Sequence, residues 1–93
     1  MREKYIEQKL VSEVKKHGGL CLKLASTGCD GIPDRLVLIS NGKIGFVELK
    51  ATNQKPRKLQ IVRIRKLKEM GFKVYVIDDC KNIGGVIDDI QTS

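Results

Sequence analysis

Residues 43–78 contain two apolar runs, KIGFVELK and FKVYVID, separated by a polar linker and a basic amphipathic stretch. Both runs have the length and composition of strands. The stretch between them has Pro56 near its start, where proline suits the first turn of a helix, and Gly71 as a stop signal, so a helix to about Met70 is predicted. Because parallel strands need a crossover of this kind, the segment is expected to form a parallel strand pair with a helix packed on it.

Two more strands are expected before this unit. RLVLIS and KIGFVELK flank the dipeptide Asn41-Gly42, which is a strong signal for a hairpin. Upstream, LCLKLAS at residues 20–26 alternates as a strand does. One side of that strand carries Leu20, Leu22 and Leu24, and the other carries Cys21, Lys23 and Ala25.

Helices are expected at both ends of the chain. A helix from about Glu3 to His17 is indicated by helically spaced apolar residues, namely Ile6, Leu10, Val11 and Val14. A weaker pattern permits a short final helix and consists of Ile83, Val86, Ile87 and Ile90. The order is αβββαβ with a weaker terminal helix, so the expected fold class is α/β, with helices packed on a mixed sheet.

Length and charge bound the class of protein. The chain has 93 residues, 41% apolar and 31% charged, which fits one folded domain over residues 1–93. Its 18 Lys and Arg exceed its 11 Asp and Glu, giving a net charge of +7. This excess favours a polyanionic partner, with nucleic acid first, although a merely soluble basic protein is an equal alternative on charge alone. Between residues 55 and 73 the only acid is Glu69, so the basic charge is concentrated.

Targeting signals and metal-binding cysteine motifs are not found. The N-terminus lacks the apolar core of a signal peptide, and no apolar run approaches membrane-spanning length. Cys21, Cys29 and Cys80 are odd in number and have no CxxC spacing, which argues against a disulfide framework or a zinc site. A reducing cytoplasmic location is therefore expected.

Two polar residues interrupt the apolar faces of the predicted helices. At about 100° per residue, Glu7 falls inside the stripe of the first helix, where a carboxylate needs a cation or a metal. An ordinary salt bridge to a lysine is the alternative. The expected core face of the second helix carries Leu59, Met70, Leu67 and Ile64. Gln60 falls between Leu67 and Ile64 on that face, and either caps a local backbone group or points into a site. The apolar residues Ile61 and Val62 point elsewhere and indicate either a subunit contact or a second packing layer.

The hairpin carries charges that a plain hairpin does not need. By the two-residue period, Glu48 and Lys50 project to the same face of their strand. A two-residue Asn-Gly loop would set Asp34 against Leu49, on the wrong face. A three-residue loop, Ser40-Asn41-Gly42 with a bulge, would shift the register by one and set Asp34 opposite Glu48. A shared site therefore requires the three-residue loop.

These residue types suit metal-assisted chemistry on a phosphate ester. Two nearby carboxylates repel each other, and a hard divalent cation relieves that repulsion. Mg²⁺ is satisfied with few protein carboxylates and keeps waters that a substrate phosphate can share. It can polarise a phosphoryl oxygen, while an adjacent lysine stabilises the developing charge. Asp34, Glu48 and Lys50 in a basic domain therefore suit metal-dependent phosphodiester hydrolysis, and the resemblance described next implies Mg²⁺ or Mn²⁺ as the metal.

The motifs PD at residues 33–34 and ELK at 48–50 resemble the PD-(D/E)xK nuclease superfamily, whose restriction-endonuclease-like core has the order αβββαβ. Together with the contexts GIPDRLVL and FVELKA, the upstream Glu7 and the glutamine of LQ, the chain resembles the VRR-Nuc family, in its small stand-alone phage and bacterial type. The resemblance runs from about Glu3 to Asp78. TNQKPRK replaces the more glycine-rich linker of the family, which bears on substrate contacts.

The resemblance implies a role for each matching residue. Asp34, Glu48 and the backbone carbonyl of Leu49 would bind the metal, and Lys50 would be the catalytic lysine. Glu7 would complete the metal site directly or through water, and Gln60 would lie near it. The resemblance also implies a substrate contact for Lys23 on the first strand. The concentrated basic charge of the linker and second helix predicts further contacts to nucleic acid at Lys55, Arg57, Lys58, Arg63 and Lys66.

The implied activity is that of a metal-dependent, structure-selective DNA endonuclease, acting as a homodimer on branched DNA such as four-way (Holliday) junctions. Its location would be the cytoplasm of a bacterial or phage-infected cell. The alternative is a catalytically silent nucleic-acid-binding module that retains the nuclease fold. A basic RNA-associated protein would explain the charge but not Glu7 and Gln60.

Overall fold

The computed structural model describes residues 1–25 and 27–93. Its elements are α1 (Glu3–Lys16), β1 (Leu20–Lys23), β2 (Arg35–Ile39), β3 (Lys43–Leu49), α2 (Lys58–Glu69), β4 (Val74–Ile77), the 3-10 turn η1 (Cys80–Asn82) and α3 (Ile83–Thr92). The expected element order and α/β class are confirmed. β1 is shorter than the strand predicted for residues 20–26, whose last residue, Ser26, lies outside the described residues. None of the described helices is long and apolar enough to cross a membrane.

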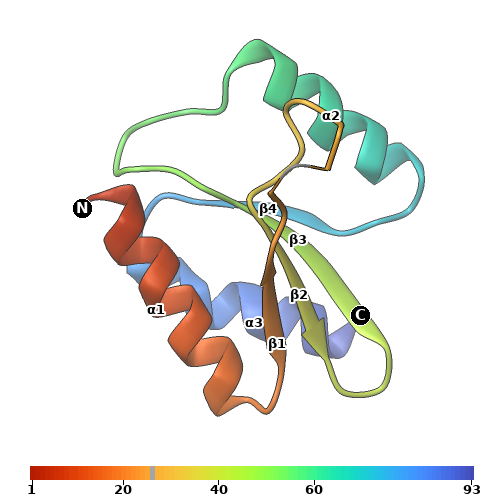
Figure 1. Cartoon of the computed structure of the whole chain (residues 1–93). Helices are drawn as coiled ribbons and strands as arrows, with labels where there is room; N and C mark the ends of the chain where they lie inside the picture. Colours follow the sequence, from red (N-terminus) through yellow and green to blue (C-terminus); the bar gives the residue numbers. More distant parts are fainter. Residues whose placement is uncertain (26) are drawn as a thin grey trace.

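The four strands form one mixed sheet in the order β1-β2-β3-β4. β2 is antiparallel to both β1 and β3, while β3 and β4 run parallel, as the crossover through α2 requires. Figure 1 shows α1 and α3 on one side of the sheet and α2 on the other. The expected mixed sheet flanked by helices is therefore confirmed.

The hydrophobic core lies between the sheet and the pair α1 and α3. It is formed by Ile6, Leu10, Val14, Val37, Ile39, Val47, Leu49, Ile77, Ile83, Ile87 and Ile90. The terminal helix α3, which had the weakest sequence pattern, contributes three of these buried residues. Its close packing depends on Gly45, since a Cβ there would lie 2.7 Å from Cγ1 of Ile90. The final helix is therefore a core element of the fold.

The opposite face of the sheet is only partly covered. Leu20 and Leu22 on β1 are 61% and 42% exposed, while Cys21 between them packs against the core. α2 covers this face incompletely: Leu67 and Gln60 are buried, but Leu59 and Met70 are 45% and 55% exposed. The expectation that Leu59 and Met70 belong to the core is wrong, because α2 is an outer layer that contacts the sheet mainly through β4.

Candidate active site

The register of the β2–β3 hairpin decides which side chains meet. Ile39 pairs with Lys43, so three residues, Ser40, Asn41 and Gly42, form the loop. Asn41 and Gly42 have positive φ angles of 69° and 71°, which suits the turn tendencies of asparagine and glycine. The two-residue loop is therefore not formed, and the register of the three-residue loop is confirmed. Continuing the pairing one step beyond Arg35 and Val47 places Asp34 opposite Glu48.

Asp34 is held by hydrogen bonds to both neighbouring segments. Its Oδ2 accepts a hydrogen bond from the backbone N–H of Leu49 at 2.9 Å, across the hairpin. Its backbone carbonyl accepts one from the N–H of Leu24 at 2.8 Å. The preceding residue, Pro33, is fully buried and fixes the path of the chain into β2. The carboxylate of Asp34 therefore has a defined position beside the end of β3.

Glu48 is the buried carboxylate of the site, with 1% exposure. Its Oε2 accepts a hydrogen bond from Nε2 of Gln60 at 2.7 Å and lies 3.2 Å from Nζ of Lys50. Its Oε1 is buried and has no hydrogen-bond partner among the described residues. Burial raises the pKa of Glu48, and the nearby charge of Asp34 raises it further, although Lys50 acts in the opposite direction. The ionised form of Glu48 is therefore destabilised in the folded protein, and a cation bound beside it would stabilise that form.

Gln60 connects the start of α2 with Glu48. Its Oε1 accepts a hydrogen bond from the backbone N–H of Arg57 at 2.8 Å, which satisfies one of the free donors at the helix start. Its amide nitrogen is thereby directed toward Glu48. Both alternatives derived for Gln60 from the sequence apply, because the side chain caps a local backbone group and also reaches the site.

Glu7 lies against Arg35, and the ion pair anticipated as the alternative for Glu7 is formed with arginine instead of lysine. Nε of Arg35 donates to Oε2 of Glu7 at 2.9 Å, and Nη1 donates to the carbonyl of Cys21 at 3.1 Å. Both side chains are mostly buried, with exposures of 17% and 21%. Burial raises the pKa of the neighbouring Cys21 thiol, and the charge of Arg35 opposes that rise. The structure therefore brings together Asp34, Glu48, Lys50 and Gln60, with Glu7 bound to the residue after Asp34.

Among the carboxylates of α1, it is Glu3, one helical turn before Glu7, whose charge affects the pKa of Glu48. Its negative charge contributes to the raised pKa of Glu48. The N-terminus is held against the segment that follows β3, since the Met1 amine donates to Oγ1 of Thr52 at 2.8 Å. Sequence reasoning did not select Glu3, which stands at the first position of α1.

Two carboxylates, those of Asp34 and Glu48, are the side-chain oxygen donors that the site offers to a divalent cation. Within residues 1–25 and 27–93, no three or more His, Cys, Asp or Glu side chains cluster as metal ligands. Mg²⁺ does not need such a cluster, because it binds through one or two carboxylates and retains several waters. Oε1 of Glu48, which has no hydrogen-bond partner within the described part of the chain, is a donor that suits such an ion. The residues present therefore fit a hard divalent cation.

The residues expected to contact nucleic acid differ in their surroundings. Five of them are exposed and form no ion pair with the described residues: Lys23, Lys55, Arg57, Lys58 and Lys66. Arg63 is half-buried, and its Nε donates to the backbone carbonyl of Asp30 at 2.8 Å. A hollow of about 380 Å³ beside Gln60 is lined by Asp30, Gly31, Arg57, Leu59 and Gln60. The hollow adjoins the candidate site at Gln60 and has one basic residue, Arg57, in its lining.

The fold and the site define an α/β protein that presents an acidic pair and a lysine on a mixed-sheet hairpin. The structure is similar to a solved VRR_NUC domain, with a TM-score of 0.85, 31% identity, and coverage of 92% of this chain and 94% of that chain. The sequence is 49% identical over 78 residues to the protein named "Putative nuclease p44" of Acyrthosiphon pisum secondary endosymbiont phage 1, covering 84% of each chain. A comparison with protein-family profiles found no match. The chain belongs to the VRR-Nuc family.

Proposed function

We propose that this protein is a metal-dependent DNA endonuclease that hydrolyses phosphodiester bonds. The observation that carries the proposal is the buried Oε1 of Glu48, which has no partner among the described residues and lies in a site with Asp34 and Lys50. A purely structural Glu48 would be expected to satisfy both oxygens, since an unpaired buried acceptor is destabilising. The similarity to a phage protein named as a nuclease supports the same activity.

In this proposal Asp34, Glu48 and the carbonyl of Leu49 hold Mg²⁺ or Mn²⁺. The bound ion would supply Lewis-acid polarisation of the phosphate and a water of lowered pKa. Asp34 is fixed by the N–H of Leu49 through Oδ2, and Glu48 is fixed by Gln60 through Oε2, so each carboxylate keeps a second oxygen for the ion. Lys50 is the catalytic lysine: its side chain is 14% exposed and pairs with Glu48, and its ammonium orients the attacking water and stabilises charge on the phosphate.

The helix α1 contributes two carboxylates with different roles. Glu7 neutralises Arg35, which follows Asp34 in β2, and so supports the position of that aspartate. Glu3 adds negative charge at Glu48, which increases the demand for a cation there. If Glu7 also contacts the metal through a water molecule, its carboxylate would have to bind that water while it remains paired with Arg35.

The DNA backbone would bind along the exposed basic residues of the linker and α2, with Lys23 on β1 as a further contact. Lysine and arginine side chains without partners are available to displace counterions from phosphates, which makes affinity fall with salt. The substrate would be branched DNA such as a four-way (Holliday) junction. A small domain offers little surface for recognising a junction, so recognition by a homodimer is part of the proposal.

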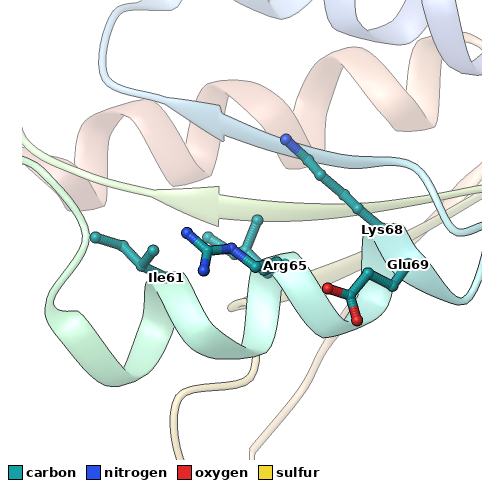
Figure 2. A pocket seen from close by; sticks show the side chains of 5 residues that line it. Ile61, Arg65, Lys68 and Glu69 are labelled. Atoms are coloured by element: carbon teal, nitrogen blue, oxygen red, sulfur yellow. The ribbon is translucent and has the colours of Figure 1, made fainter.

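The outer side of α2 is the surface proposed for dimerisation. Ile61 and Val62 are 45% and 55% exposed, and Val76 on the edge strand β4 is 41% exposed. A hollow of about 430 Å³ along this helix is lined by Ile61, Ile64, Arg65, Lys68 and Glu69. Figure 2 shows the side chains of Ile61, Arg65, Lys68 and Glu69 along the helix. Its lining combines apolar side chains with charges of both signs, which a two-fold copy could pair reciprocally. None of these lining residues belongs to the candidate active site, so a second copy there would leave the site open.

The test is a cleavage assay with labelled four-way junction, flap and linear duplex DNA, in Mg²⁺, Mn²⁺ or EDTA. Metal-dependent cutting, with preference for a branched substrate, is expected. Asp34→Asn and Lys50→Ala should abolish cutting while leaving DNA binding in EDTA largely intact. Failure to cut any substrate, with binding retained, would instead identify a silent nucleic-acid-binding module.

A further inference from the structure

The loop before Asp34 packs tightly against α2 at Gly31. Gly31 has a φ of +82°, and a Cβ at this position would lie 2.9 Å from Cγ of Leu59 and 3.1 Å from Cγ of Arg63. It would also lie 3.0 Å from the carbonyl oxygen of Leu59. Both the backbone angle and the lack of space require glycine. The loop and the helix therefore meet at van der Waals contact through the glycine backbone.

Arg63 fastens the same loop to the helix. Its Nε donates to the carbonyl of Asp30 at 2.8 Å, next to the close approach at Gly31. The side chain is less exposed than those of its helix neighbours Arg65 and Lys66. Part of the guanidinium is thus committed to the protein backbone, although sequence reasoning assigned Arg63 to DNA contact.

The helix α2 consequently holds both strands that carry the site. Gln60 donates to Glu48 at the end of β3, and Arg63, one helical turn later, holds the loop that leads through Pro33 to Asp34. Residues three apart lie on the same side of a helix, so both contacts come from one face. A displacement of α2 relative to the loop would change the distance between the two carboxylates.

We propose that Arg63 is a positioning residue, which with Gly31 docks the Asp34 loop on α2 and sets the spacing between Asp34 and Glu48. This inference rests on the proposed function only in that the spacing serves a divalent cation. Misplacement of a catalytic group by about 1 Å can lower a rate by about 100-fold, so a contact outside the reacting atoms can control the reaction. A phosphate contact at Arg63 would act on DNA affinity and its dependence on salt.

The experiment compares Arg63→Gln with Gly31→Ala, which disturbs the same contact without removing a charge. Both variants should lower the cleavage rate at saturating junction DNA by about ten-fold or more. Both should also weaken Mn²⁺ binding, measured by electron paramagnetic resonance without DNA, by several-fold. The salt dependence of junction binding in EDTA should match that of the wild type for both variants.

Controls separate positioning from charge and from folding. Lys66→Gln, at an exposed position of α2, should reduce the slope of log K against log salt by about 0.9 if that lysine meets a phosphate. Lys15→Gln, near the C-terminal end of α1, is the charge-matched control and should leave the rate and Mn²⁺ affinity unchanged. Arg63→Lys keeps the charge and should not restore the rate of Arg63→Gln. Circular dichroism establishes that each variant is folded, and the two Arg63 variants suffice should Gly31→Ala fail to fold.

Two results would overturn the proposal. One is an Arg63→Gln variant with the wild-type rate at saturating DNA and a reduced salt slope, since that describes a phosphate contact. The other is wild-type Mn²⁺ affinity in every folded variant. If the wild type itself cuts no DNA, the proposed function fails, and Mn²⁺ affinity together with the salt slope still decides whether Arg63 positions the site.

Discussion

Gln60 and Glu48 are joined by a buried hydrogen bond of 2.7 Å, which links the first turn of α2 to the carboxylate of β3. Because the same glutamine also accepts the N–H of Arg57, its removal affects the helix start and the site together. We predict that Gln60→Leu lowers the free energy of unfolding by about 1–3 kcal/mol, measured by urea denaturation. Gln8→Leu, at an exposed position of α1, should change it by less than about 0.5 kcal/mol.

The raised pKa of Glu48 makes stability depend on pH. A carboxyl whose pKa is raised on folding stabilises the fold while it is protonated, below its ordinary pKa, and that stabilisation is lost as the pH rises through the folded-state value. Glu48→Gln, which stays neutral, should therefore melt at a higher temperature than the wild type at pH 7 without metal. The difference should disappear in acid. A less stable Glu48→Gln variant at pH 7 would show that the Lys50 pair outweighs burial.

Divalent cations should make the wild type melt at a higher temperature than Glu48→Gln, the opposite of the order expected without metal. A cation bound at Glu48 stabilises the folded state by an amount that grows with its concentration above the dissociation constant. Mg²⁺ or Mn²⁺ should raise the melting temperature of the wild type and leave that of Glu48→Gln nearly unchanged, as measured by scanning calorimetry. An equal rise in both proteins would place the cation elsewhere.

Substitutions of the two α1 acids, Glu7 and Glu3, should differ in their effects on stability and on the pKa of Glu48. Glu7→Gln leaves Arg35 mostly buried without a counter-ion, so we expect a loss of about 1–3 kcal/mol in unfolding free energy. Glu3→Gln should change stability little and should lower the pKa of Glu48, because it removes a negative charge that raises it. A double-mutant cycle with Arg35→Gln would measure the Glu7 coupling, and no coupling would contradict the ion pair.

The contact between Gly45 and Ile90 tests the placement of α3. Gly45→Ala should destabilise the fold by about 1–3 kcal/mol, since its Cβ would overlap the Ile90 side chain. Ile90→Val removes the Cδ1 atom and should recover part of that loss in the double variant. Gly42→Ala is a useful comparison: its added Cβ meets nothing, and only the positive φ of 71° opposes it.

The proposed dimer surface can be distinguished from the exposed leucine face of β1. Sedimentation equilibrium should give a mass of twice the 10.4 kDa chain. Ile61→Lys with Val62→Lys should give the monomer mass, because charges would be buried at the interface. Leu20→Lys should leave the dimer intact. A monomer produced by Leu20→Lys alone would move the interface to the sheet.

Much of the site could be predicted from local patterns. The two-residue period placed Glu48 and Lys50 on one face, and the need for Asp34 to join them required a three-residue loop, which the pairing of Ile39 with Lys43 confirms. Helical phase selected Gln60, whose side chain reaches Glu48. These predictions succeed because backbone geometry fixes side-chain direction within an element.

The order of the elements follows from the sequence, which left two registers open for the hairpin and favoured one of them only because a shared site required it. Tertiary packing was needed to show that Arg35 pairs with Glu7, that Arg63 holds the Asp30 carbonyl, and that Leu20 and Leu22 face outwards. Periodicity shows that a strand or helix has two different sides. Which side is buried, and which charge meets which, depends on the other elements that pack there, and their contacts join residues far apart in the chain.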